Sequence, residues 1–167
     1  MSLASRLALG FGALVAMEPV TALVHRFVMH GFAMGWHRSH HEPPRGRLEA
    51  NDLFPVVFAT ATIVMLSVGV YVGGGFGVLV PIGTGITAYG AAYLLVHDVV
   101  IHRRAPWLAL PDGLLAWHRH AHNVHHLDSG APYGFLAPVV PRARRARAER
   151  SGRDRTVRTV PACSGSR

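Results

Sequence analysis

The stretch LFPVVFATATIVMLSVGVYV-GGGFG-VLVPIGTGITAYGAAYLLV, residues 53–96, decides the fold of this 167-residue chain. Its two apolar runs, Leu53–Val72 and Val78–Val96, contain twenty and nineteen residues and no charged side chain. About 20 apolar residues cross a hydrocarbon core of ~30 Å, so each run predicts a membrane-spanning helix. The glycine-rich link Gly73–Gly77 predicts the turn of a membrane hairpin. Buried helices of a soluble protein are the alternative, and two charge-free runs of this length in so short a chain argue against it.

A third apolar run, Leu7–Val24, precedes the hairpin and is interrupted only by Glu18, which Pro19 follows. Arg6 and the first part of this run would also suit a secretory signal peptide. The run resumes after Pro19 and leads directly to His25, so cleavage would remove much of the span. We therefore predict a retained first helix. Glu18 is a functional candidate, because a carboxylate inside a membrane is costly unless it is paired.

The three runs predict an all-α fold, an integral membrane helical bundle that occupies residues 1–141. Residues 142–167 form a basic tail, in which nine of the seventeen arginines are opposed only by Glu149 and Asp154, giving +7 of the net charge of +8. Such a sequence buries too little apolar area to fold alone and is expected to be disordered. Its arginines favour an anionic lipid surface over nucleic acid, since no aromatic residues are interleaved with them. The lone cysteine, Cys163, excludes an intrachain disulfide and a thiolate metal site.

Ten of the twelve histidines fall into two copies of one pattern. In each copy a pair of histidines separated by four residues precedes an HxxHH motif: His25, His30, His37, His40 and His41 in the first copy, and His97, His102, His122, His125 and His126 in the second. Imidazole is the commonest protein ligand for iron, zinc and copper. Two equivalent sets of five therefore predict two metal ions held side by side. His118 and His120 fit no repeat and are expected at the surface or behind the ligands.

Both histidine sets should lie on one side of the membrane, because each follows an apolar run and the hairpin returns the chain to its starting side. That side carries most of the arginines before the tail: Arg26, Arg38, Arg45, Arg47, Arg103, Arg104 and Arg119. The opposite side carries Arg6 and the neutral glycine turn. The positive-inside rule then predicts cytoplasmic histidines in a bacterial-type inner membrane, with the N-terminus outside. Leu108–Trp117 is apolar but too short to span, and is expected to dip into the interface.

Helical geometry predicts how the histidines are shared between the ions. Positions i, i+3 and i+4 lie on one face of an α-helix, so the three histidines of each HxxHH motif should converge. The histidines of each earlier pair are five residues apart, about 140° around an α-helix. One ion could not easily take both members of such a pair. We therefore expect each pair to be divided between two ions, which favours a dinuclear site.

Other histidine-rich membrane proteins fit the pattern less well. A transmembrane cytochrome needs axial pairs deep in a bundle, and a zinc transporter needs ionisable ligands inside its spans. A zinc peptidase needs a motif with a general-base carboxylate such as HExxH, which is absent from the sequence. Eight to ten nitrogen ligands for two metals instead suit iron chemistry that activates oxygen. A membrane location suits a lipid-soluble substrate.

At these residues the chain resembles the non-haem di-iron carotene hydroxylases, within the wider fatty acid hydroxylase superfamily. The resemblance covers roughly residues 12–138. It extends beyond the histidines to Met17-Glu18, His25-Arg-Phe-Val-Met-His30-Gly31, Trp36-His37-Arg-Ser-His40-His41-Glu42-Pro43, Asn51-Asp52-Leu53, Thr87-Ala88-Tyr89-Gly90, His97-Asp98-x3-His102-Arg-Arg, Ala121-His122-x2-His125-His126 and Gly134-Phe135-Leu136. The chain departs from the family at Val99-Val100-Ile101, at 105–117 and after His126, and every histidine of the boxes is retained.

The resemblance implies β-carotene 3-hydroxylase activity, which converts β-carotene to zeaxanthin through cryptoxanthin. It implies two iron ions, dioxygen as co-substrate and an external ferredoxin-type electron donor. The implied ligands are the ten histidines of the two boxed sets. The alternatives are a carotenoid ketolase, a lipid desaturase or hydroxylase with the same boxes, or a non-catalytic metal-binding membrane protein.

Three carboxylates next to these histidines are candidates to orient the imidazole rings: Glu42, Asp52 and Asp98. A metal-bound histidine usually donates its second ring N–H to such an acceptor. Solvated surface carboxylates are the alternative for Glu42 and Asp52. Asp98 follows His97 directly and is the best placed of the three.

Overall fold

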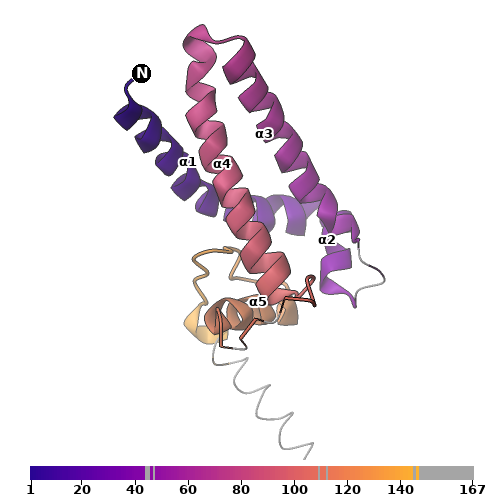
Figure 1. Cartoon of the computed structure of the whole chain (residues 1–167). Coiled ribbons are helices and arrows are strands. Elements are labelled where there is room, and N and C mark those ends of the chain that lie inside the picture. The colour runs from indigo at the N-terminus through magenta and orange to yellow at the C-terminus, as the bar shows by residue number, and fades with distance from the viewer. Residues whose placement is uncertain (44–45, 47, 109, 112, 145, 147–167) are drawn as a thin grey trace, which may run out of the picture.

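The computed structural model describes residues 1–43, 46, 48–108, 110–111, 113–144 and 146, and every structural statement below refers to these residues. They form helices and no strands, which confirms the predicted all-α class (Figure 1). Almost all of the predicted basic tail, residue 145 and residues 147–167, lies outside the described residues.

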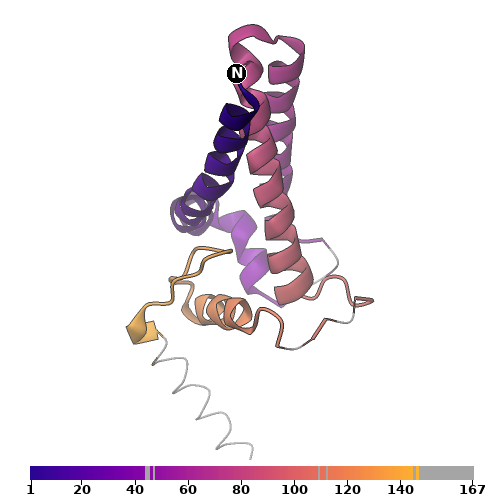
Figure 2. The same ribbon diagram turned by 60° about the vertical axis from the view of Figure 1, so that its left-hand side comes forward.

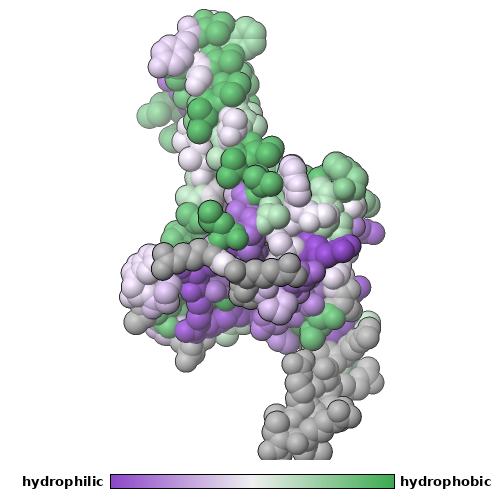
Figure 3. All heavy atoms as spheres, turned by 90° about the vertical axis from the view of Figure 1, so that its right-hand side faces the viewer, coloured by the Kyte–Doolittle hydropathy of each residue, from purple (hydrophilic) through white to green (hydrophobic). Residues whose placement is uncertain are grey.

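Three helical segments are long and apolar enough to cross a membrane, as predicted: Leu3–Phe32, Ala50–Tyr71 and Gly74–Ile101. The first comprises α1 (Leu3–Leu23) and the π-helix η1 (Val24–Phe32). The second comprises the short 3-10 helix η2 (Ala50–Asp52) and α3 (Leu53–Tyr71). The third comprises the 3-10 turn η3 (Gly74–Val78), α4 (Leu79–Tyr93) and the π-helix η4 (Leu94–Ile101). On the face of the molecule seen in Figure 3, the upper part of the bundle is largely apolar.

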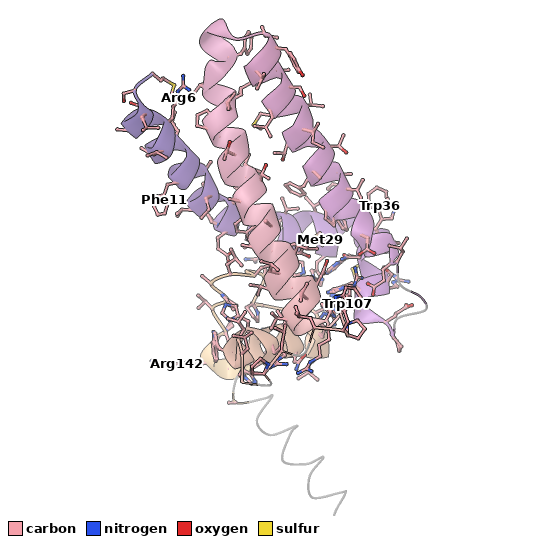
Figure 4. The ribbon with its side chains drawn as sticks, viewed as in Figure 1. Arg6, Phe11, Met29, Trp36, Trp107 and Arg142 are labelled. Carbon is pink, nitrogen blue, oxygen red and sulfur yellow. The ribbon has the colours of Figure 1, made fainter. Side chains whose placement is uncertain are left out.

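The hairpin between α3 and α4 turns at the predicted glycines. Gly73 and Gly74 have φ angles of 64° and 54°, a region that glycine enters without the steric cost of a Cβ atom. This turn lies at the end of the molecule remote from the histidines, near Arg6 (Figure 4). The chain therefore returns to the side on which η1 ends.

The central helix of the bundle is α4, which packs against α1 on one side and α3 on the other. Close approach of α1 and α4 depends on Gly10 and Gly85, since a Cβ atom at Gly85 would collide with the carbonyl oxygen of Gly10. Small residues at such crossings are typical of membrane helices, where close packing replaces the hydrophobic effect as the driving force.

Two shorter helices complete the histidine-bearing end. The first, α2 (Met34–His41), follows η1, and α5 (Ala116–Asp128) lies across the ends of the spans (Figures 1 and 2). In the segment before α5, Trp107 is 83% exposed and Leu108 and Leu114 are also exposed. The membrane bundle thus ends in a polar cap that α2, α5 and the chain after α5 build.

Candidate metal centre

Eight histidines form two compact groups at this end of the bundle. We call His25, His30, His37 and His125 the first group, and His40, His97, His102 and His122 the second group. Within each group, one ring nitrogen of every histidine lies within 4.8 Å of those of the others. A metal about 2.1 Å from each nitrogen would hold them roughly 3 Å to 4.2 Å apart. Each group is therefore close to the size that one ion requires.

The nitrogens that converge are the Nε2 atoms. In the first group, His37 Nε2 lies 3.1 Å from His25 Nε2 and 3.2 Å from His30 Nε2, and His30 Nε2 lies 3.1 Å from His125 Nε2. In the second group, His40 Nε2 lies 3.2 Å from His97 Nε2 and 3.4 Å from His122 Nε2, which is 2.9 Å from His102 Nε2.

The two remaining boxed histidines, His41 and His126, lie between the groups. Their rings stack with centroids 4.4 Å apart. His41 Nε2 lies 3.1 Å from His37 Nε2, which assigns it to the first group. The His126 ring is 4.4 Å from that of His122, and its buried Nε2 atom has no hydrogen-bond partner. All ten boxed histidines thus gather at one place, and each group has a fifth member at its edge.

We expected the two histidines of each earlier pair, which are five positions apart, to be divided between two ions, and this expectation is wrong. His25 and His30 share the first group, and His97 and His102 share the second. The reason is the backbone, because His25 and His30 lie on the π-helix η1, and His97 lies on the π-helix η4 with His102 as the residue that caps its end. The N–H of His102 bonds to the carbonyl oxygen of His97 at 3.0 Å, an i→i+5 bond that sets the two residues one above the other.

The rings of each HxxHH motif lie close together, but the predicted convergence of all three on one place is not seen, because each motif divides between the two groups. His37 and His40 occupy neighbouring turns of α2, with ring centroids 5.6 Å apart, yet belong to different groups. His122 and His125 do the same on α5. Each group therefore combines histidines from both halves of the sequence.

Oxygen atoms behind the rings set the orientation of several histidines. In the first group, Nδ1 of His25 bonds to the Tyr133 carbonyl at 3.0 Å and that of His125 to the Gly130 carbonyl at 2.6 Å. Nδ1 of His37 lies 2.8 Å from Oδ1 of Asn51. Because these oxygens can only accept, each Nδ1 carries the proton and the Nε2 lone pair faces the group. Lone pairs that converge at about 3 Å call for a cation between them.

The second group has carboxylates behind its rings. Asp98 Oδ1 lies 2.8 Å from His97 Nδ1, and Glu49 Oε2 lies 3.5 Å from His40 Nδ1. Arg104 connects the two carboxylates, at 3.1 Å from Glu49 and 4.0 Å from Asp98, and also pairs with Asp52 at 2.6 Å. Of the three candidate carboxylates, Asp98 contacts the histidine His97, as predicted. Asp52 instead accepts hydrogen bonds from Arg104 and from the backbone N–H of Glu49. Glu42 lies exposed at the end of α2.

Burial keeps the rings neutral. Together with the neighbouring imidazoles, it lowers the pKa of His37 to about 4 and those of His102, His125 and His126 to about 3. The pKa values of His40 and His122 are also lowered, for the same reasons. Neutral imidazole is the form that binds a metal.

Glu18 in the first span explains how the chain after α5 is held against the site. Its carboxylate accepts backbone N–H bonds from Phe135, Leu136 and Ala137, at 3.0, 3.0 and 2.9 Å, and a bond from the Tyr89 hydroxyl at 2.7 Å. The Glu18 carboxylate therefore has hydrogen-bond donors around it, as expected for a carboxylate inside a membrane-spanning helix, where an unpaired one would be costly. The same segment supplies the Tyr133 carbonyl behind His25.

Phe135 closes the inner side of the site. Its ring stacks on His25 with centroids 5.1 Å apart, and its centroid lies 5.4 Å from that of His97. His118 bonds to the Leu136 carbonyl at 2.9 Å and lines a small cavity with His25 and His122. His120 contacts Trp117 and lies in neither group.

Fold and site together define a helical membrane protein whose paired histidine groups form a metal site. Residues 11–143 match the family described as fatty acid hydroxylase. The chain belongs to the fatty acid hydroxylase family, which is a family of oxidoreductases.

Its curated relatives come from bacteria and plants. A beta-carotene hydroxylase of Pantoea ananas is 40% identical over 148 residues, covering 85% of this chain and 83% of the relative. A beta-carotene hydroxylase of Pseudescherichia vulneris is 42% identical over 127 residues, covering 73% and 70%. The chloroplastic beta-carotene 3-hydroxylase 1 of Arabidopsis thaliana is 41% identical over 140 residues, covering 78% and 44%. No solved structure matches the chain.

Proposed function

We propose that this protein is a carotenoid hydroxylase that adds a hydroxyl group to carbon 3 of a β-ionone ring. Acting on both rings, it would convert β-carotene to zeaxanthin through cryptoxanthin. The observation that carries the proposal is the pair of histidine groups, each with a fifth histidine at its edge, at the ends of three apolar spans. The names of relatives about 40% identical over most of the chain supply the substrate class.

The proposed cofactors are two iron ions, one in each group. His25, His30, His37, His41 and His125 would hold the first ion, and His40, His97, His102, His122 and His126 the second. The donor set fits, since neutral imidazoles suit iron and their Nε2 lone pairs already converge. Bound iron would supply the activation of dioxygen, with two electrons from an external ferredoxin-type donor.

The contribution of the chain itself is to position the ligands and to exclude water. His25, His37 and His125 are almost completely buried, and the rings of Phe135 and Tyr93 stack on those of His25 and His97. A dry site protects a reactive centre from side reactions with water. The acceptors behind the rings hold each imidazole in the tautomer that leaves Nε2 free.

The carotenoid would reach the site from the lipid. Exposed apolar side chains continue along the spans to the level of the histidines: Leu23 and Phe27 on the first span, and Leu94 and Leu95 on the third. An apolar polyene could therefore stay in the hydrocarbon while one ring enters the cap.

We also propose that the histidine end faces the cytoplasm of a bacterial-type inner membrane. The arginines predicted for this side support that orientation. Trp36 and Trp107 lie toward the same end of the bundle (Figure 4), and tryptophan is enriched at membrane interfaces.

The decisive experiment is expression in a bacterial strain that accumulates β-carotene, followed by chromatography of the pigments. Cryptoxanthin and zeaxanthin are expected. Keto products would instead identify a ketolase, and further unsaturated products a desaturase. The His40→Ala and His125→Ala variants should insert into the membrane and leave β-carotene unchanged, and continued zeaxanthin formation in either would contradict their role as ligands.

A further inference from the structure

The two histidine groups differ in the charge of the atoms behind their rings. In the first group the acceptors at Nδ1 are neutral: two backbone carbonyls, of Tyr133 and Gly130, and the side-chain amide oxygen of Asn51. In the second group the carboxylate of Asp98 accepts from His97 Nδ1 at 2.8 Å, and Oε2 of Glu49 lies 3.5 Å from His40 Nδ1 without a hydrogen bond to it. Both kinds of acceptor orient a ring, but only a carboxylate adds negative charge to it.

A carboxylate that accepts the Nδ1 proton makes the imidazole a stronger donor at Nε2, because the ring gains imidazolate character. Such partners typically change metal affinity 10- to 100-fold. The effect should be present at His97 in the second group and at none of the three oriented ligands of the first, and the charge of Glu49 lies close to a further ligand, His40.

The surrounding charges increase this difference. Glu49, Asp52 and Asp98 all approach Arg104, so three carboxylates face one guanidinium and the local charge remains negative. Beside the first group, the Arg26 guanidinium lies 6.0 Å from the centre of the Tyr133 ring, whose carbonyl orients His25. Glu18 directs its bonds to backbone N–H groups and to Tyr89. A divalent cation is therefore favoured more strongly in the second group.

We propose that the two metal positions are inequivalent, and that the second group binds a divalent metal at least tenfold more tightly and fills first. Asp98 and Glu49 act as positioning residues that set this affinity, and Arg104 holds both carboxylates in place. The inference rests on the proposed metal binding and adds an order of loading to it.

The test is a titration of the metal-free, full-length protein in detergent micelles with Co²⁺, in competition with a chelator. Wild type should bind two Co²⁺ ions in two separate steps. His102→Ala should remove the tighter step and His30→Ala the weaker one, which assigns each step to a group. A single step with two equal sites, or the reverse assignment, would overturn the proposal.

Two charge changes of matched shape provide the sharper measurement. Asp98→Asn keeps the size of the side chain and should weaken the tighter step 10- to 100-fold while leaving the weaker step unchanged. Asn51→Asp places a carboxylate behind His37 and should strengthen the weaker step. A gain of affinity cannot come from damage to the fold, so this variant separates charge from a merely structural role. Glu49→Gln is the second test of the tighter step if Asp98→Asn does not fold.

The outcomes distinguish the inference from the proposed function. A protein that hydroxylates β-carotene but shows two equal Co²⁺ sites would refute the inequivalence alone. A protein that binds no Co²⁺ would refute both. Equal weakening of both steps by Asp98→Asn would also refute the inference, because the carboxylate would then act through the whole cap.

Discussion

Glu18, in the first span, accepts a hydrogen bond from the backbone N–H of Ala137 at 2.9 Å, across 119 residues of sequence. Two further N–H bonds and the Tyr89 hydroxyl complete its surroundings. The carboxylate therefore fastens the segment after α5 to the membrane bundle. That segment carries the carbonyls that orient His25 and His125.

Replacing this carboxylate with an amide should loosen the segment. Glu18→Gln loses the negative charge that three N–H donors share, and hydrogen bonds to charged groups contribute about 1.5–3 kcal/mol. We expect a lower melting temperature, reduced metal retention and little hydroxylation, with helix content unchanged. Thermal unfolding in detergent and metal analysis would measure this. Thr21→Val, which removes only the hydroxyl beside Tyr89, is the control and should have a smaller effect.

The ligand assignment predicts a difference between two histidines that differ only in position. His30→Ala should lower the bound metal to about half and abolish hydroxylation, because His30 belongs to the first group. His120→Ala should change neither, because His120 lies in neither group. Metal content of the purified variants and pigment chromatography are the readouts. Normal metal content in His30→Ala would remove this residue from the ligand set.

The π-helical register of η4 predicts a strong effect of a single inserted residue. An alanine between Val99 and Val100 would separate His97 from His102 by one more position and break their i→i+5 bond. His102 would turn away from the second group, and the tighter metal site should be lost. A glycine inserted into the Gly73–Gly77 turn, at the opposite end of the hairpin, is the matched control and should be tolerated. Equal activity of both insertions would show that the register is not required.

Metal removal should destabilise the protein, because the converging lone pairs then face each other without a cation. At a free metal concentration 100 times Kd, each site should contribute about 2.7 kcal/mol. Unfolding of chelator-treated protein is therefore expected at a distinctly lower temperature than unfolding of reloaded protein. The His30→Ala, His102→Ala double variant should show little response to added metal. A full response in that variant would place the stabilising site elsewhere.

The crossing of α1 and α4 gives a prediction that is independent of metal. Gly85→Ala places a Cβ atom against the Gly10 carbonyl and should cost about 1–3 kcal/mol by overpacking. Gly90→Ala, on the same helix, meets no atom within 4 Å and should be neutral or slightly stabilising. Unfolding in detergent compares the two. Equal stability would mean that α1 can move away from α4 at no cost.

The helices and the gathering of the histidines could be predicted because they depend on local composition. Long uncharged runs predict membrane spans, and the glycine-rich link between Val72 and Val78 predicts the turn. The division of the histidines could not be predicted, since it depends on whether the backbone bonds run to i+4 or i+5. The side chains of Val24–Phe32 give no pattern that distinguishes a π-helix from an α-helix.

The residues behind the rings were only partly accessible from sequence. Asp98 follows His97 directly in the sequence, and this proximity was sufficient to predict their contact. Glu49 reaches His40 across a turn, and Arg104 joins Glu49, Asp52 and Asp98 from distant positions. Backbone carbonyls such as that of Tyr133 carry no signal in the side-chain sequence.

The mixed origin of each group sets an order of events during synthesis. The first group needs His125 and the second needs His122, both on the last described long helix. Neither coordination sphere can be completed while the ribosome is still translating the hairpin. If these histidines hold the metal as proposed, its insertion would follow synthesis of α5, and a truncated nascent chain would have no complete site in which to trap an ion prematurely.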